Sequence, residues 1–222
     1  MMKTSALMAA FCLGLAGCVT TQDAFTGESK ISRAAKGTGI GAAGGALAGA
    51  LIGKASNNTR RGALIGAGIG ALAGGGVGVY LDRQEAELRQ QLQGTGVSVT
   101  RNGDQIILNL PSNVTFASGA DQVQPNFHSV LNSVAIVLNK YNQTLVDVFG
   151  HTDSDGDDTS NFNLSQRRAT NVASYLATQG VDGRRFGIQG FGEQRPIATN
   201  ATPEGKSQNR RVEIQISPLT QS

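Results

Sequence analysis

Two residues of this sequence, an aspartate and an arginine, have side chains and a spacing in the chain that would let them bind a ligand together. Asp153 ends the run Gly-His-Thr-Asp, directly after the apolar segment 145–149, and Arg167 and Arg168 lie in a later motif. On a helical wheel, Arg168 borders the apolar stripe of its expected helix, whereas Arg167 points to solvent. A carboxylate and a guanidinium could together bind a zwitterion, with its ammonium group on Asp153 and its carboxylate on Arg168. A structural salt bridge between the two residues fits the same spacing.

The elements that must position these residues alternate between strand and helix signals. Short apolar segments predict five strands, at 97–100, 106–110, 145–149, 186–190 and 212–216. The pair Asn102-Gly103 predicts a hairpin between the first two strands. One helix is predicted to begin near Pro125 and another to cover 164–178, which places Arg168 in its first or second turn, near an N-terminus that favours anions. The order predicts an α+β sandwich, a mixed sheet with helices on one face.

The loop between the third strand and the second helix is acidic. It contains four aspartates, at 153, 155, 157 and 158. An EF-hand loop counted from Asp153 would need glycine at its sixth position and glutamate at its twelfth, where the sequence has Asp158 and Leu164. A solvated acidic loop is therefore favoured, and a nonstandard calcium site is the alternative.

Catalytic chemistry has little support in the sequence. The chain has two histidines, His128 and His151, and no nucleophile-elbow pattern accompanies either of them. The sequence predicts that His151 packs at a strand end, and that the protein is neither an enzyme nor the carrier of a cofactor or metal.

The N-terminus has the pattern of a targeting signal. Lys3 precedes an uncharged stretch, 4–17, that is shorter than the ~20 residues of a spanning helix. Small residues stand directly before Cys18, which resembles the bacterial lipobox, in which the cysteine thiol receives a lipid. The sequence therefore predicts a signal peptide at 1–17 and a lipid anchor on Cys18, with an ordinary signal peptide as the alternative. Cys12 would be removed, so the mature chain would have no disulfide.

Two glycine series follow a polar tether at 18–36. Glycines recur every four residues, at 37, 41, 45, 49 and 53 and again at 62, 66, 70, 74 and 78. The residues between them are largely apolar, unlike those of flexible linkers. Each helical glycine costs ~1 kcal/mol relative to alanine, which close packing of helix backbones can offset. The pattern predicts a helical hairpin and then a short helical stalk within 37–93, either entering a membrane or packing into a homo-oligomer.

The charge balance argues against a nucleic-acid partner. The whole chain has a formal net charge of +3, but the residues from Gly94 onward contain ten basic and eleven acidic side chains. The predicted folded domain therefore lacks the positive field that nucleic-acid binding usually needs.

Three ordered motifs resemble the OmpA-like peptidoglycan-binding domain over about 105–217. They are Gly150-His-Thr-Asp153, Asn161-x-x-Leu164-Ser-x-x-Arg168-Ala and Asn209-Arg-Arg-Val-Glu-Ile214. The resemblance implies that Asp153 and Arg168 hold the free amine and carboxylate of diaminopimelate in the wall peptide, with Asn161, Leu164 and Thr152 lining the pocket. Phe116 is followed by alanine where the family often has Asp or Asn, so the resemblance assigns no contact to that loop.

The lipobox, the glycine series and this domain together resemble an OmpA-family lipoprotein. The resemblance implies a lipid-anchored protein that links a membrane to peptidoglycan, and Val19 favours the outer membrane, facing the periplasm, with the inner membrane as the alternative. An envelope assembly factor that acts through the glycine zipper, or a calcium-binding module, is the alternative function. The expected division of the chain is 1–17, 18–36, 37–93 and 94–218.

Overall fold

The computed structural model describes residues 20–22, 29–31, 59–72 and 76–220. They fall into two units, divided after Gly41. In the first unit, strand β1 (Thr20–Gln22) pairs antiparallel with β2 (Ser29–Ile31). The expected signal peptide, the lipid anchor on Cys18 and the first glycine series, 37–53, lie outside the described residues.

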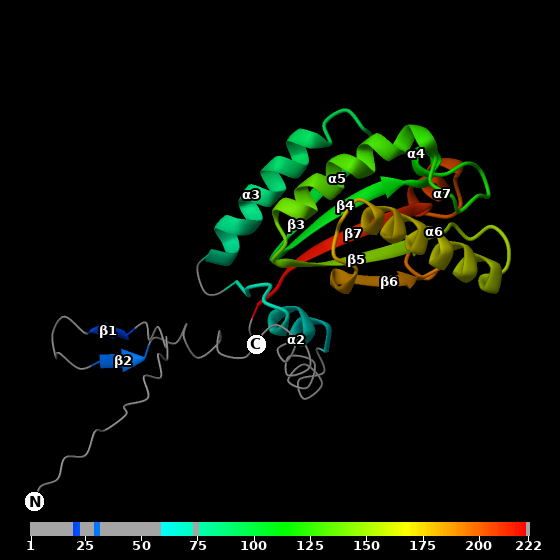
Figure 1. Cartoon of the computed structure of the whole chain (residues 1–222). Helices are drawn as coiled ribbons and strands as arrows, with labels where there is room; N and C mark the ends of the chain where they lie inside the picture. The colour runs from blue at the N-terminus through cyan, green and yellow to red at the C-terminus, as the bar shows by residue number, and fades with distance from the viewer. Residues whose placement is uncertain (1–19, 23–28, 32–58, 73–75, 221–222) are drawn as a thin grey trace, which may run out of the picture. The chain divides into compact units, whose positions relative to one another are not determined.

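A five-stranded mixed sheet forms the centre of the second unit (Figure 1). Its strands are β3 (Ser98–Asn102), β4 (Gln105–Pro111), β5 (Thr144–His151), β6 (Phe186–Gly190) and β7 (Arg211–Pro218). The spatial order is β3-β4-β7-β5-β6, in which β5 and β6 run parallel and the other neighbours antiparallel. All five strands lie where the apolar segments predicted them. Because β7 lies beside β5, His151 at the end of β5 pairs with Arg211 at the start of β7.

The predicted hairpin joins β3 and β4. Asn102 pairs with Gln105, so Gly103 and Asp104 form a two-residue turn. Gly103 has a φ of +55°, a conformation that glycine adopts without strain. The turn therefore lies one residue further along the chain than the Asn102-Gly103 pair suggested.

Helices cover one face of the sheet (Figure 1). They are α3 (Gly76–Gln91), α5 (His128–Lys140) and α6 (Asp158–Thr178). Pro125 begins a short 3₁₀ turn, η1 (Pro125–Phe127), which leads into α5 as predicted. Shorter elements are α4 (Ser112–Thr115), η2 (Gly183–Arg185) and α7 (Pro203–Asn209). Alternate residues of β4, such as Ile106 and Leu108, are fully buried against the helices. The predicted α+β class with a mixed sheet is confirmed.

Helix α6 begins six residues earlier than the predicted range 164–178. Asp157 caps the helix, because its carboxylate accepts a hydrogen bond from the Ser160 amide at 2.9 Å. The helix ends as predicted, with Gly180 following at a φ of +90°. Arg168 therefore lies in the third turn, and the expectation that the helix N-terminus would help it to bind an anion is wrong.

Helix α3 packs into the core, so the prediction of a stalk is wrong. Leu81 and Leu88 of this helix, and Leu92 just after it, are buried in the main apolar cluster with side chains of α5 and the sheet. The leucines recur on one face of the helix, and burying that face stabilises the helix against the domain. The folded domain therefore begins before Gly94, the predicted boundary.

The second glycine series does not form one helix over 62–78 in the described residues. Helix α2 (Thr59–Gly66) ends within the series, and Gly68 in the following turn has a φ of +86°. Helical structure is next found at Gly76, where α3 begins. The four-residue glycine period is therefore not sufficient to keep this segment helical.

Helix α2 packs on the sheet face opposite to α5 and α6. Leu64 is fully buried against Leu145 of β5, and Arg60 forms an ion pair with Asp147 at an N–O distance of 2.8 Å. Gly187 makes room for this pair, because a β-carbon there would overlap both charged groups.

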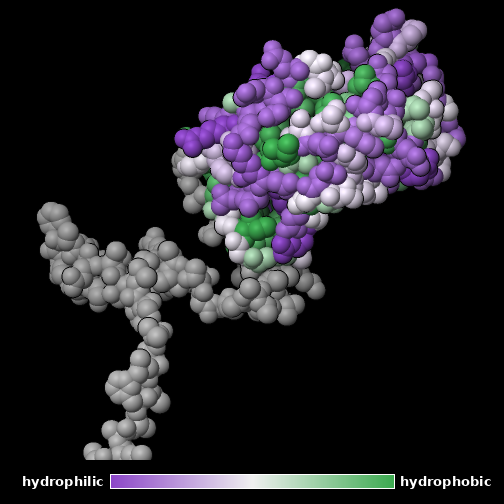
Figure 2. All heavy atoms as spheres, turned by 45° about the horizontal axis from the view of Figure 1, so that its top comes forward, coloured by the Kyte–Doolittle hydropathy of each residue, from purple (hydrophilic) through white to green (hydrophobic). Residues whose placement is uncertain are grey.

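The surface of the second unit is mostly hydrophilic on the face shown in Figure 2. The exposed large apolar side chains come from five separate segments of the described chain: Val79, Ile136, Phe162, Ile188 and Ile197. None of the helices within residues 59–72 and 76–220 has a stretch long and apolar enough to cross a membrane.

Candidate ligand-binding site

Close packing of α6 on β5 and β6 fixes the geometry of the site. Gly150 and Gly190 lie under Ser165 and Gln166, and a β-carbon on either glycine would overlap the helix backbone. The Gly190 amide donates to Gln166 Oε1 at 2.6 Å, and the Gly192 amide donates to Ser165 Oγ at 2.9 Å. The glycine and the serine of the first two motifs therefore position the helix against the strands.

Asp153 lies just beyond the carboxyl end of β5 and is 6% exposed. Its Oδ2 accepts a hydrogen bond from Arg210 Nη1 at 2.5 Å, and its Oδ1 accepts one from the Asp155 amide at 3.3 Å. Arg210 immediately precedes β7, the neighbour of β5 in the sheet. The two side chains therefore form an ion pair across the ends of adjacent strands.

The third motif gives three successive residues three different roles. Asn209 is fully buried. Its side-chain oxygen accepts hydrogen bonds from two backbone amides of the preceding loop, and its side-chain nitrogen donates to two oxygens of the same loop. Arg211 is also buried and donates to Glu213 at 2.7 Å and to two carbonyl oxygens. Arg210 is the member of the motif that reaches Asp153. From the sequence alone, the motif assigned no role to Arg210.

Arg168 is 4% exposed, on the sheet side of α6 as the helical wheel predicted. Its Nε donates to the Ala120 carbonyl oxygen at 2.9 Å, and its guanidinium lies 5.0 Å from the centre of the Phe116 ring. Burial lowers the pKa of the guanidinium, although the group stays charged at neutral pH. Within the described residues, its two terminal nitrogens donate to no protein group.

The alternative of a structural salt bridge between Asp153 and Arg168 is wrong. The ion pair of Asp153 is with Arg210, and the Arg168 side chain donates to a backbone carbonyl instead. Asp153 and Arg168 are near enough for the Asp153 charge to act on the pKa of Arg168, which it raises against the larger lowering by burial. The corner therefore offers a buried carboxylate and a guanidinium whose terminal nitrogens are open to a ligand.

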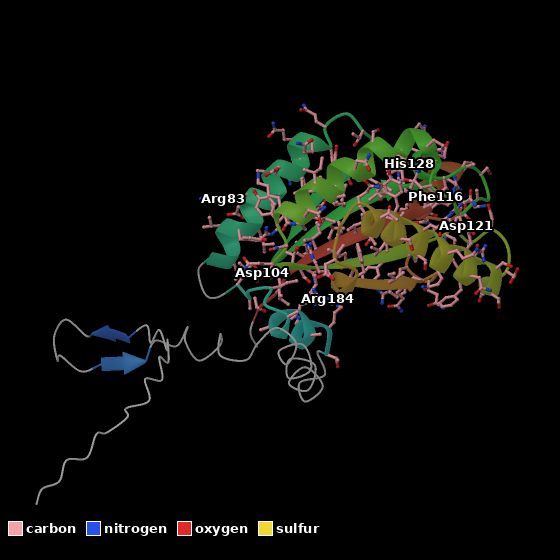
Figure 3. All side chains as sticks on the ribbon, in the orientation of Figure 1. Arg83, Asp104, Phe116, Asp121, His128 and Arg184 are labelled. Carbon is pink, nitrogen blue, oxygen red and sulfur yellow. The ribbon has the colours of Figure 1, made fainter. Side chains whose placement is uncertain are left out.

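The loop after Phe116 is bound to α6, although the sequence alone assigned it no contact. Arg167 is exposed as predicted, but its Nε pairs with Asp121 at 2.5 Å, and Asn171 donates to the Asp121 carbonyl oxygen at 2.8 Å. Phe116 and Asp121 lie at the same end of the sheet and helices in Figure 3. The loop thus supplies Arg168 with an aromatic ring and, from Ala120, a carbonyl oxygen.

The other predicted residues lie around the same corner. Asn161 is 6% exposed, and its Nδ2 donates to two carbonyl oxygens of the acidic loop and to Glu193 Oε2 at 2.8 Å. Thr152 is 3% exposed, and its buried hydroxyl has no protein partner within the described residues. Leu164 is half-buried on the turn of α6 between Asn161 and Arg168, and the three share one helix face.

Three of the four aspartates of the acidic loop have protein partners among the described residues. Asp155 pairs with Lys206 at 2.6 Å, Asp157 caps α6, and Asp153 pairs with Arg210. In the part of the chain that the structure describes, no cluster of three or more His, Cys, Asp and Glu side chains is arranged to hold a metal ion.

His151 is buried at the end of β5, as the sequence predicted. Burial lowers its pKa to about 4, and the nearby Arg211 acts in the same direction. The neutral ring stacks on Phe191 with the ring centres 5.5 Å apart, and neither ring nitrogen has a hydrogen-bond partner among the described residues. His151 therefore contributes packing at neutral pH.

Comparison with known proteins gives matches at both ends of the chain. The model of the OmpA family matches residues 115–210, and the model of the YMGG-like Gly-zipper matches residues 1–82. "Probable lipoprotein YiaD" of Escherichia coli (strain K12) is 51% identical over 207 residues, which cover 93% of either chain. "Peptidoglycan-binding protein ArfA" of Mycobacterium tuberculosis is 39% identical over 104 residues, 47% of this chain and 32% of that protein.

Solved structures show the same fold. The cell wall anchor of the T6SS from Pseudomonas aeruginosa is 35% identical, with a TM-score of 0.55, and the match covers 61% of this chain and 97% of that one. The periplasmic domain of Helicobacter pylori MotB is 27% identical, with a TM-score of 0.51, over 57% of this chain and 82% of that one.

Proposed function

This chain belongs to the OmpA family, as a lipoprotein of the YiaD type, and on that premise we propose that its C-terminal domain binds peptidoglycan without catalysing a reaction. The family that the sequence motifs resembled is confirmed, because the YiaD relative matches nearly the whole chain. Two relatives of the domain, the peptidoglycan-binding protein ArfA and the cell wall anchor of the T6SS, support a wall ligand for this chain.

The observation that carries the proposal is the open guanidinium of Arg168 beside the buried carboxylate of Asp153. An ammonium group can bind Asp153, which has one protein cation as a partner within the described residues. A carboxylate can bind the terminal nitrogens of Arg168 in the bidentate manner that a guanidinium favours. Arg210 lies beside Asp153 as a second cation for an anionic ligand.

Diaminopimelate is the proposed ligand within the wall peptide, because its side chain carries both an amine and a carboxylate. We propose that Asp153 and Arg168 bind these groups and that Asn161, Leu164 and Thr152 line the pocket. The unpartnered hydroxyl of Thr152 supports a polar contact there. No side chain of the corner is assigned a catalytic role, since His151 is buried and its low pKa keeps it neutral.

The lipid anchor on Cys18 belongs to the same proposal. An acylated Cys18 would hold the domain at the outer membrane, facing the periplasmic wall, with the glycine zipper available for self-association. A fatty-acid probe should label the wild-type protein and leave Cys18→Ser unlabelled. Equal labelling of the two proteins would contradict the anchor.

Cosedimentation with peptidoglycan sacculi tests the proposed site. The experiment uses the full chain purified in detergent, because a chain cut at Gly94 would lack the buried leucines of α3. Asp153→Ala and Arg168→Ala should each weaken binding by about 2–5 kcal/mol, since each leaves a charge without its partner. Arg168→Lys should also bind weakly, because an ammonium group cannot fork onto a carboxylate.

Two arginines serve as controls for these variants. Arg184→Ala removes an exposed arginine that lies far from Phe116 and Asp121 (Figure 3), and binding should not change. Arg167→Ala removes an exposed ion pair and should change binding little. Arg168→Ala should lower stability by only about 1 kcal/mol, because it loses one hydrogen bond. If folded Asp153→Ala and Arg168→Ala bind sacculi like the wild type, the proposed site is wrong.

A further inference from the structure

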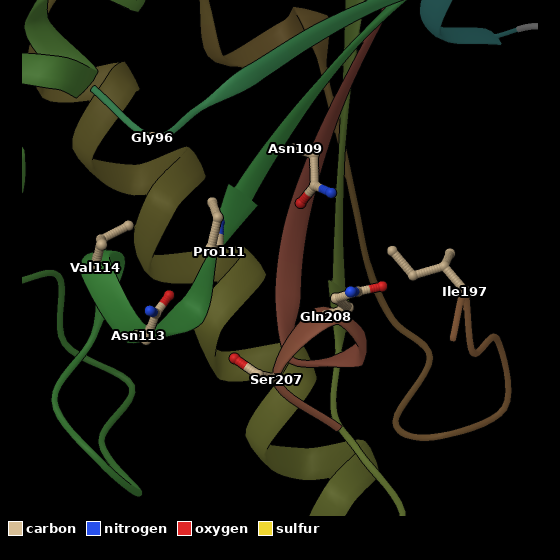
Figure 4. Close-up of a pocket in the computed structure, with 8 residues that line it drawn as sticks. All are labelled: Gly96, Asn109, Pro111, Asn113, Val114, Ile197, Ser207 and Gln208. Carbon is tan, nitrogen blue, oxygen red and sulfur yellow. The ribbon is translucent and has the colours of Figure 1, made fainter. Parts of the chain in front are cut away.

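A short loop, residues 117–122, lies against the Arg168 guanidinium, and its base is fixed to the sheet. The base follows α4, which lies at the end of β4 beside a hollow of about 450 Å³ (Figure 4). The Ser112 amide of α4 donates to the Arg210 carbonyl oxygen at 2.9 Å. Across the base, the Gln124 amide donates to the Thr115 carbonyl oxygen at 2.9 Å. Neither bond holds the loop itself, half of which is exposed: Ala117, Ser118 and Gly119.

Two successive carbonyl oxygens of the loop accept hydrogen bonds from α6. Arg168 Nε donates to the Ala120 oxygen at 2.9 Å, and Asn171 Nδ2 donates to the Asp121 oxygen at 2.8 Å. Arg168 and Asn171 are three residues apart, so their side chains share one face of the helix. The Asn171 bond therefore holds the loop backbone where the Ala120 oxygen meets Arg168.

The other tie between the loop and α6 is weaker. Arg167 Nε pairs with the Asp121 carboxylate, but 56% of the Arg167 side chain is exposed. Exposed ion pairs contribute little. Asn171 is half-buried, and its bond to the loop is partly shielded from water. Asn171 is therefore the main anchor of the loop on the helix.

The bond to Ala120 decides which nitrogens of Arg168 a ligand can use. Nε is occupied, and the guanidinium carbon lies 5.0 Å from the centre of the Phe116 ring, so the loop and the ring together limit how the group can turn. The donors of a guanidinium form a rigid planar fork, so an engaged Nε leaves Nη1 and Nη2 as the free pair. A carboxylate must therefore approach Arg168 end-on, across these two nitrogens.

We propose that Asn171 is a positioning residue: by fixing the loop 117–122 on α6, it aims the free end of the Arg168 guanidinium at the carboxylate of the ligand. The inference rests on the proposed function, since this carboxylate belongs to the diaminopimelate held between Arg168 and Asp153. Without the Asn171 bond, the Ala120 oxygen no longer fixes the guanidinium, which must then be ordered when the ligand binds. Ordering one long side chain on binding weakens the affinity by about 3- to 10-fold.

Calorimetry with two tripeptides tests this role on the full chain in detergent. One tripeptide ends in diaminopimelate, and the other ends in lysine, which keeps the side-chain amine and lacks the side-chain carboxylate. The wild-type protein should bind the diaminopimelate peptide more tightly. Asn171→Ala and Asn171→Leu should each weaken the binding of this peptide about 3- to 10-fold and leave the lysine peptide unchanged. A purely structural role of Asn171 would weaken the binding of both peptides alike.

Asn139→Ala is the matched control. Asn139 Nδ2 donates to the Gln179 carbonyl oxygen at 3.0 Å, just beyond the other end of α6, so the variant loses the same kind of bond away from the loop. It should bind both peptides like the wild type. Exchange of the Arg168 Nε–H with water, followed by NMR, gives a second readout without ligand. The exchange should be faster in Asn171→Ala than in the wild type or in Asn139→Ala, because the bond to Ala120 is weakened.

The outcomes separate the positioning role from the proposed function. The positioning role is overturned if both Asn171 variants discriminate between the peptides as the wild type does, or if they bind both peptides more weakly to the same extent. Unchanged exchange of the Arg168 Nε–H in Asn171→Ala would overturn it too. Asn171 is half-buried, and Asn171→Leu keeps the side-chain volume, so this variant should fold. If the wild-type protein binds the two peptides equally, or binds neither, the proposed function fails and the positioning role fails with it.

Discussion

Three pairs of adjacent arginines occur in the domain, and each pair contains one buried member. The pairs are Arg167-Arg168, Arg184-Arg185 and Arg210-Arg211. Arg185, directly before β6, is 1% exposed and makes four hydrogen bonds, three to backbone carbonyl oxygens and one to the Thr144 hydroxyl. Arg168, at the other end of the domain, is buried to nearly the same degree but makes one.

The difference between Arg185 and Arg168 lies in how completely the protein satisfies each guanidinium. The carbonyl oxygens of Leu138, Tyr141 and Thr144 surround Arg185, so no donor faces a possible ligand. Arg168 keeps two nitrogens without partners among the described residues, beside the carboxylate of Asp153. Burial alone therefore does not distinguish a structural arginine from a binding arginine, whereas the count of satisfied donors does.

The largest expected effect comes from removing the satisfied arginine. Arg185→Met should destabilise the protein by about 3–5 kcal/mol, because it removes four hydrogen bonds and leaves buried carbonyl oxygens unpaired. Burial lowers the pKa of Arg185 to about 10, so the wild-type side chain is charged at neutral pH. Urea unfolding measures the loss, and the folded fraction should still bind sacculi. If folded Arg185→Met protein fails to bind sacculi, the assignment of a structural role to Arg185 and a binding role to Arg168 is contradicted.

His151 extends the comparison to a buried base without hydrogen-bond partners among the described residues. Its pKa is about 4 in the folded protein, against an ordinary value of about 6.5 in the unfolded chain. The unfolded state therefore takes up the proton first as the pH falls, and the native state loses stability between about pH 6.5 and 4, by about 3 kcal/mol. This stability is fully present above about pH 6.5. Glu213 opposes the shift, whereas Arg211 adds to it.

Replacing His151 with leucine isolates this titration. Thermal unfolding of His151→Leu should depend less on pH in this window than unfolding of the wild type. His128→Leu is a control, because His128 is the other histidine of the chain and lies half-buried at the start of α5, where its ring stacks on Tyr175. Equal pH dependence in all three proteins would show that His151 does not titrate differently on folding.

Much of the fold could be predicted from local patterns. The strands coincide with short apolar segments and the hairpin has its glycine turn, because both depend on neighbouring residues. The start of α6 could not be predicted from apolar periodicity, because its first turn is polar and is set by the Asp157 cap. The glycine period of 62–78 predicted one continuous helix, which the structure does not have. Helix α2 ends at Gly66 and buries Leu64 against the sheet, so tertiary packing determines the structure of this segment.

The candidate site was predictable where one helix face carries it. Leu164 and Arg168 lie four residues apart within the predicted helix, so their shared face followed from the sequence. Asn161 joins this face because α6 begins at Asp158, before the predicted helix start. The role of Arg210 depends on β7 lying beside β5, a contact between strands far apart in the chain that no local pattern contains. The family motif marked this residue without explaining it.

The smallest expected effect concerns Gln84, a buried polar group with no partner among the described residues on either atom of its amide. It is fully buried in α3 on the face that carries Leu81 and Leu88. Unlike Arg168, it faces the apolar core and lies in no ligand-binding corner, so its missing hydrogen bonds only reduce stability. Gln84→Leu should therefore raise the free energy of unfolding by about 1 kcal/mol.

Gln90→Leu makes the same change at an exposed position of α3 and should have almost no effect. Urea unfolding of the three proteins measures both changes, and sacculus binding should be equal in all three. A loss of stability in Gln84→Leu would show that the amide has a partner in the folded protein, and the count of satisfied donors would then fail at this position.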